Sequence, residues 1–175
     1  MKLGYVLSLG VLSLSLSGCG LFAGPPPETV PSMVVPSPSH AKSQWMTVNS
    51  ADHSLSLTVI AGYQSHGFNL NGTQNGAMWI TVPVHWHVTV HFTNDSGLSN
   101  SLAVVPGPTS NHVVFPGAST KDLTNGISQG QSRVFSFTPT RTGHFRLASL
   151  VPGHEDSGMW AHFVVTDGGK PSLRF

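Results

Sequence analysis

The 175-residue chain has one cysteine, Cys19, near its N-terminus. The remainder of the chain therefore has no thiol for a disulfide, a zinc cluster or a cysteine nucleophile. Charge is also scarce, because eight lysines and arginines nearly balance seven aspartates and glutamates. So small a net charge provides no strong field to attract nucleic acid, and we expect no nucleic-acid partner.

Residues that favour helices are few, since alanine, glutamate and lysine are sparse. Valine, threonine, serine, glycine and phenylalanine dominate instead, and β-branched and aromatic residues suit a pleated, half-buried surface. This composition predicts an all-β protein. Its length is enough for one domain with appendages and too short for two ordinary domains.

The N-terminal segment indicates export. Lys2 precedes an apolar run over residues 3–16, which ends in Leu-Ser-Gly-Cys at residues 16–19. A charged start, an apolar stretch and a small-residue end predict a signal peptide over residues 1–18. The ending resembles the lipobox of bacterial lipoproteins. The resemblance implies that Cys19 becomes an acylated N-terminus that anchors the chain to the outer face of the cell membrane.

An uncleaved transmembrane anchor is the alternative, for which the apolar run is slightly short and rich in serine. Both alternatives place the remainder of the chain outside the cytoplasm. Residues 19–44 carry many prolines among serines and glycines, which excludes a regular strand or helix and predicts an extended spacer. The folded domain is expected over residues 45–175.

Within this domain, short alternating runs are separated by turn residues, and seven or eight strands in about 120 residues are typical of a sandwich or a small barrel. The expected strands are residues 54–60, 68–71, 78–82, 87–93, 101–105, 133–138, 143–149 and 159–166. Residues 111–131 show no convincing alternation. We expect them to form a long loop.

Histidine is abundant, with ten in the chain. His85, His87 and His91 share one face of an expected strand and could bind a metal ion as a row. Alternate residues of a strand are about 7 Å apart, which is loose for a compact site, so an exposed polar face is the favoured interpretation. His144, Arg146 and His162 also alternate with apolar residues, and we expect them at the surface.

The segment of residues 149–160, Ser-Leu-Val-Pro-Gly-His-Glu-Asp-Ser-Gly-Met-Trp, is the most specific motif. It resembles the ligand loop of cupredoxins, most closely that of the sulfocyanin and rusticyanin group. In that group, a cysteine, four residues, a histidine, four residues and a methionine supply three of the four copper ligands. The resemblance extends over about residues 68–165. It implies a cupredoxin-like Greek-key β-sandwich and, by default, electron transfer through copper.

Carried over by position, the resemblance places His154 and Met159 at retained copper-ligand positions. The cysteine position is occupied by Ser149. The remaining histidine position is occupied by Asn100, 49 residues earlier, which is close to the usual spacing in the family. Two of the four ligand positions are therefore substituted.

These substitutions disable a thiolate-bonded copper site. A serine hydroxyl is not ionised near neutral pH, and an amide oxygen is a much weaker copper donor than an imidazole. His154 and Met159 could still bind Cu(I) weakly, with a third ligand such as His112 from the long loop. Alternatively, His154 hydrogen-bonds to Asn100 or Ser149 and no metal binds.

Three functions stay open at this point. The first is an accessory or interaction module, for example beside a respiratory oxidase or another redox protein; the second is weak copper binding for delivery; the third is copper-dependent electron transfer. An enzyme is not expected. Ser149 lacks the Gly-x-Ser-x-Gly context of a hydrolase nucleophile, and the nearby acids belong to its own loop.

Overall fold

The computed structural model describes residues 44–175. The signal peptide over residues 1–18, the acylated Cys19 and all of the spacer except Gln44 lie outside the described residues. The boundary at residue 45 likewise stays a prediction. The described part of the chain includes no helix long and apolar enough to span a membrane.

Nine strands form the domain within the described residues 44–175. They are β1 (Met46–Asn49), β2 (Ser54–Ala61), β3 (Trp79–Pro83), β4 (His87–Asn94), β5 (Ala103–Val105), β6 (Ser132–Phe137), β7 (Gly143–Ala148), β8 (Trp160–Thr166) and β9 (Ser172–Arg174). The prediction of an all-β chain is confirmed.

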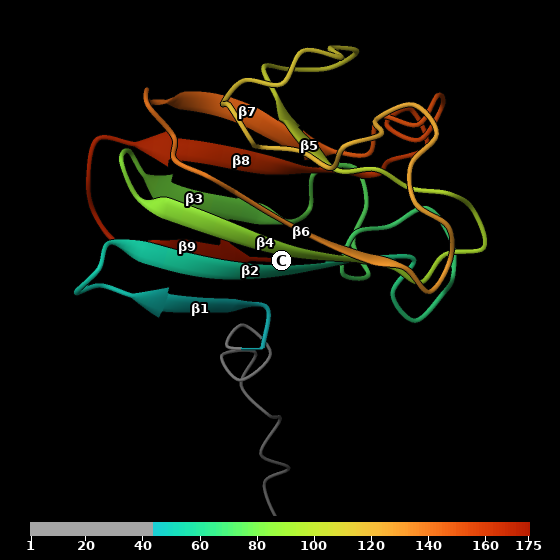
Figure 1. The fold of residues 1–175 in the computed structure, drawn as a ribbon, viewed down its shortest axis with the longest axis horizontal. Coiled ribbons are helices and arrows are strands. Elements are labelled where there is room, and N and C mark those ends of the chain that lie inside the picture. The colour runs from blue at the N-terminus through green and yellow to red at the C-terminus, as the bar shows by residue number, and fades with distance from the viewer. Residues whose placement is uncertain (1–43) are drawn as a thin grey trace, which may run out of the picture. The chain divides into compact units, whose positions relative to one another are not determined.

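The strands make two packed sheets, ordered β1-β2-β4-β6 and β5-β7-β8-β3-β9 (Figure 1). Most neighbouring pairs are antiparallel, but β2 pairs with β4 and β3 with β8 in parallel. The chain passes from β2 to β3 in the other sheet and back to β4, so these parallel partners are not consecutive. Such crossings between two sheets produce the predicted Greek-key sandwich.

The core lies between the sheets because the strand sequences alternate. In β2, the buried residues are Leu55, Leu57, Val59 and Ala61, whereas the residues between them are only partly buried. Since side chains of a strand point to opposite faces in turn, each alternating strand contributes one apolar face to the core. Phe92, Phe115 and Phe163 are among the largest fully buried side chains.

The structure corrects the strand predictions in two respects: one predicted strand is absent, and two strands were not predicted. Residues 68–71 are not a strand, because Asn71 has a left-handed backbone (φ 51°) and only Leu70 makes isolated bridges. The sequence also missed β1 and β9, which raises the number of strands to nine. β9 has only three residues, and β1 has one buried residue followed by three exposed ones, so neither has the sustained alternation that identifies a strand.

The long loop after β5 has no strand over residues 111–131, as predicted. Phe115 from this loop is buried and packs edge-on against Phe145, at 5.1 Å between ring centroids. The same loop contributes Val113 and Leu123 to a second small apolar cluster around Ala103, Val105 and Ala148. The loop is therefore packed onto the sandwich at two places.

Candidate functional site

The residues at the four candidate ligand positions come from two loops. Asn100 lies between β4 and β5, and Ser149, His154 and Met159 lie in the connection from β7 to β8. Figure 1 shows that β4 and β7 lead into loops at the same end of the sandwich, at the right of the view. All four residues are buried, His154 being the most exposed at 6%.

Turns within the loop of residues 149–159 place His154. Its N–H donates to the Val151 carbonyl at 3.0 Å, and its own carbonyl accepts from the Met159 N–H at 3.0 Å. The Ser149 N–H donates to the Met159 carbonyl and closes the loop at its base, at 3.0 Å. Gly153 and Gly158 have left-handed backbones, at φ 83° and 93°. These two glycines permit the tight turns on either side of the histidine.

Three polar atoms converge inside this loop. Asn100 Oδ1 lies 2.9 Å from His154 Nδ1, Ser149 Oγ lies 3.2 Å from His154 Nδ1, and the two oxygens are 3.4 Å apart. Ser149 Oγ also accepts the Ser101 N–H at 3.4 Å. Asn100, Ser149 and His154 are thus joined directly by hydrogen bonds.

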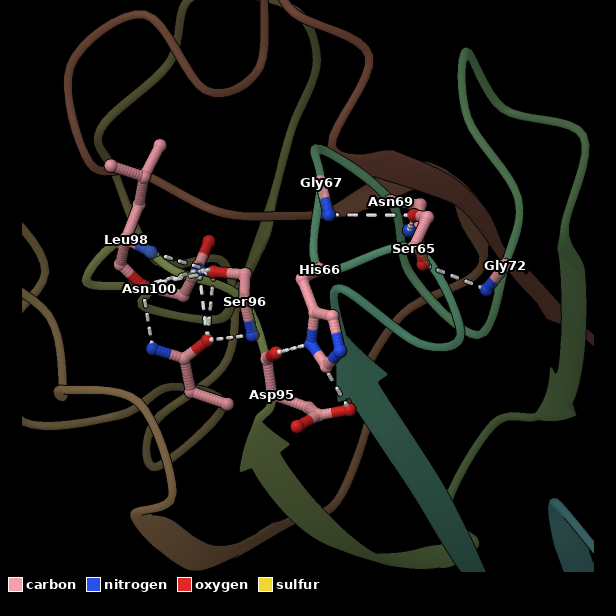
Figure 2. A network of polar contacts seen from close by, with 10 residues as sticks. Ser65, His66, Gly67, Asn69, Gly72, Asp95, Ser96, Leu98 and Asn100 are labelled. Carbon is pink, nitrogen blue, oxygen red and sulfur yellow. Dashed lines mark hydrogen bonds and ion pairs between the residues drawn. The ribbon is translucent and has the colours of Figure 1, made fainter.

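The amide of Asn100 is fixed in orientation. Its Nδ2 donates toward Ser96 Oγ at 2.6 Å, Asn94 Oδ1 at 3.0 Å and the Leu98 carbonyl at 3.1 Å (Figure 2). All three are acceptors, so Oδ1 must face His154. Oδ1 cannot donate, and the hydrogen-bond pattern therefore assigns the imidazole proton to Nδ1.

Asn94 supports this arrangement from a buried position at the end of β4. Its Nδ2 donates to the Leu98 and Ile127 carbonyls, both at 2.7 Å, while its Oδ1 accepts from Ser96 N–H and Oγ, both at 3.0 Å. Sequence reasoning missed Asn94 and Ser96. The only available signal was an asparagine that ends an alternating strand just before a turn.

A neighbouring loop braces the same region. Nδ1–H of His66 donates to the Asp95 carbonyl at 2.7 Å (Figure 2). Gly62 approaches so closely that an added Cβ would lie 2.6 Å from Ser96 Cα. The loops after β2 and β4 therefore hold each other in place, and the Asn94–Asn100 contacts are preorganised.

Burial lowers the pKa of His154, because desolvation disfavours the charged imidazolium. The neutral ring, with its proton on Nδ1, is therefore the form that this environment favours. The ring of Phe68 packs against it in a T-shaped contact at 5.2 Å.

The site does not fit the copper ion that a cupredoxin fold implies. In the plane of Asn100 Oδ1, Ser149 Oγ and His154 Nδ1, the point equidistant from the three atoms lies about 1.8 Å from each, whereas metal–nitrogen and metal–oxygen bonds are about 2.0–2.2 Å. An ion in the trigonal plane of a cupredoxin site would therefore have to push these atoms apart. Two of the three atoms are neutral oxygens, and the third carries a proton where a metal needs a lone pair. Among residues 44–175, no buried side-chain nitrogen or oxygen lacks a hydrogen-bond partner.

Met159 contributes differently. Its side chain is 1% exposed and belongs to the main apolar core. His112 is exposed in the long loop, and its backbone N–H donates to Ser110 Oγ at 3.3 Å. Within the described residues, no three histidine, cysteine, aspartate or glutamate side chains are grouped so that they could hold a metal ion.

The row of histidines on β4 is an exposed polar face. His87 and His91 are exposed, and His85 lies outside the strand in a left-handed turn at φ 67°. His144 is also exposed, as expected. Arg146 and His162 are half-buried instead, because aromatic side chains of neighbouring strands cover them.

An ion pair anchors the outer side of the loop. Arg146 Nη1 donates to Glu155 Oε1 at 2.7 Å, and its guanidinium lies 3.7 Å above the Trp160 ring. The other oxygen of Glu155 accepts the Thr109 N–H at 3.0 Å. Glu155, which the sequence assigns to the loop alone, therefore connects the site loop with β7 and with the loop after β5.

Comparison with known proteins agrees with this architecture. Residues 40–169 match the model of the Sulfocyanin (SoxE) domain. The chain is 31% identical over 133 residues to a sulfocyanin of Sulfolobus acidocaldarius, a match that covers 68% of this chain and 67% of the relative.

Two rusticyanin structures share the fold. Rusticyanin from Thiobacillus ferrooxidans has a TM-score of 0.51 at 19% identity, over 70% of this chain and 88% of rusticyanin. A substituted rusticyanin has a TM-score of 0.54 at 18% identity, over 70% of this chain and 86% of that one.

Proposed function

The chain belongs to the sulfocyanin family of cupredoxins, and from this premise we propose that it is an accessory or interaction module whose copper site has been replaced by a hydrogen-bonded network. The cupredoxin fold and the predicted resemblance to sulfocyanin are confirmed. The replacement of two copper ligands by Asn100 and Ser149, and the role that follows from it, are the proposal. The observation that supports it most is the short contact of Asn100 Oδ1 with His154 Nδ1.

This contact opposes metal binding in three ways. A metal on Nδ1 would require loss of the imidazole proton from that atom or its transfer to the other ring nitrogen. It would also have to separate oxygens that now lie at hydrogen-bonding distance. Rotation of the Asn100 amide would not help, because its nitrogen would then face His154 and its bonds to Ser96 and Asn94 would be lost.

The proposal includes a location. An anchor at Cys19 and the proline-rich spacer after it would hold the domain outside the cytoplasm, at the outer face of the cell membrane. There the module would associate with a respiratory oxidase or another redox protein. The family relationship and the sequence of residues 1–44 support this part.

Metal titration of the full chain tests the proposal. Cu(I) and Cu(II) are added separately, and binding is followed by calorimetry and absorbance, with His154→Ala as the matched variant. We expect no stoichiometric binding of either ion that depends on His154. Cu(I) binding that His154→Ala abolishes would instead support delivery of copper, and a reversible copper redox wave would support electron transfer; either result contradicts the proposal.

A further inference from the structure

The outward face of the five-stranded sheet carries a row of aromatic side chains with an arginine at each end. We call Arg146, Trp160, His162, Trp79 and Arg174 the Trp–Arg face. Strand register brings them together, because His162 on β8 lies opposite Arg146 on β7 and Trp79 on β3, and Trp79 lies opposite Arg174 on β9. Four strands thus contribute to one continuous surface.

Direct contacts hold this face in one arrangement. The His162 ring stacks on Trp79 at 3.7 Å and meets Trp160 at 5.1 Å, nearly perpendicular to it. The Arg146 guanidinium lies over Trp160, and the Arg174 guanidinium lies 5.5 Å from the Trp79 centroid. A Cβ on Gly76 would lie 2.3 Å from the Trp160 ring, so the backbone of the loop before β3 closes over the indole.

Positive charge is in excess on this face. The five strands of the sheet contain no aspartate or glutamate. Glu155 from the site loop balances Arg146, whereas Arg174 is exposed and forms no ion pair within residues 44–175. The exposed His144 lies beside the row on β7 and adds an imidazole that can hydrogen-bond to a carboxylate.

We propose that the Trp–Arg face is a docking surface for an acidic patch of a partner protein. This inference rests on the proposed function as an interaction module and specifies the surface and the chemistry of the partner. Tryptophan and arginine are the residues most enriched among binding hot spots. Their stacking here restricts the side chains before a partner arrives, which reduces the entropy that binding must cost.

Charge complementarity selects an acidic protein over an uncharged one, since the exposed Arg174 has no ion-pair partner within residues 44–175 and can meet a carboxylate. A lipid bilayer fits less well. Trp79 and Trp160 are both half-buried and packed against their neighbours, so neither indole is free to insert between lipids.

The four tryptophans of the chain allow a direct test. The full chain, labelled with ¹⁵N at the indoles, is titrated with poly-L-glutamate while the four indole N–H signals are followed by NMR. We expect the Trp79 and Trp160 signals to shift, the Trp45 and Trp86 signals to stay, and the effect to weaken as salt is added.

Charge reversal provides the matched pair of variants. Arg174→Glu should weaken poly-L-glutamate binding about tenfold. Arg133→Glu, at an exposed position on β6 of the other sheet, should change it less than about twofold. Equal effects of both variants, equal shifts of all four indoles, or no binding would overturn the inference. So would binding only to phosphatidylglycerol vesicles. The proposed function fails if the chain binds copper through His154, which the titration with poly-L-glutamate does not measure. The two failures can therefore be told apart.

Discussion

Removal of the Asn94 side chain should destabilise the domain more than its polar character suggests. Asn94 is fully buried and takes part in five side-chain hydrogen bonds, with Ser96 N–H and Oγ, Asn100 Nδ2, and the carbonyls of Leu98 and Ile127. Most of these partners keep a second bond when Asn94 is lost. The Ser96 N–H has no other bond within residues 44–175 and would be left unsatisfied.

An unsatisfied buried group costs about 1–3 kcal/mol, and each further lost bond costs about 0.5–1.5 kcal/mol. Because the other four partners each keep a second hydrogen bond, we count the unsatisfied N–H and about one further bond. We therefore expect Asn94→Ala to lower the free energy of unfolding by about 2–4 kcal/mol. Asn125→Ala is the matched control, because the Asn125 amide bonds, within residues 44–175, only to Asp122 at the surface. It should cost less than about 0.5 kcal/mol.

Urea unfolding followed by tryptophan fluorescence measures both changes. A loss below about 0.5 kcal/mol for Asn94→Ala, with an unchanged dependence on urea, would refute the reasoning. It would mean that the network around Asn100 is not rigid, and the assigned proton on His154 Nδ1 would lose its support.

Two further predictions concern pH and backbone geometry. Burial lowers the pKa values of His154 and His162, so the unfolded chain binds protons more readily than the folded one. The free energy of unfolding should therefore fall as pH decreases below about 6.5. In urea midpoints measured from pH 7 to pH 5, His154→Gln should reduce that fall, and an identical fall would contradict a lowered pKa of His154. Gly76→Ala should cost about 2 kcal/mol or more, because its Cβ would meet the Trp160 ring. Gly130→Ala, at a similar φ with open space around it, should cost only about 1 kcal/mol, and equal thermal shifts for the two variants would disprove the close approach.

Much of the fold could be predicted from the sequence where burial alternates. Strands β2, β4 and β8 each show a period of two, because one side of each faces the core. The short edge strands β1 and β9 are defined by pairing to a neighbour rather than by an apolar face. Their existence depends on tertiary hydrogen bonds that no local pattern encodes.

The candidate site could likewise be predicted only in part. The resemblance of residues 149–160 to a cupredoxin ligand loop was enough to bring Asn100, Ser149 and His154 under consideration, and the structure brings their side chains together. The supporting role of Asn94 could not be predicted, because it depends on contacts between separate loop segments. The half-burial of Arg146 was missed for a related reason, since strand register decides which aromatic ring covers it.

The most direct test of the central claim restores the two substituted positions. We expect the double variant Asn100→His, Ser149→Cys to develop an intense blue charge-transfer band with Cu(II), because a thiolate and two imidazoles would then meet at one point. The unsubstituted chain should stay colourless under the same conditions. A double variant that folds, as judged by circular dichroism, yet shows no such band would contradict the claim that these residues occupy a former copper site.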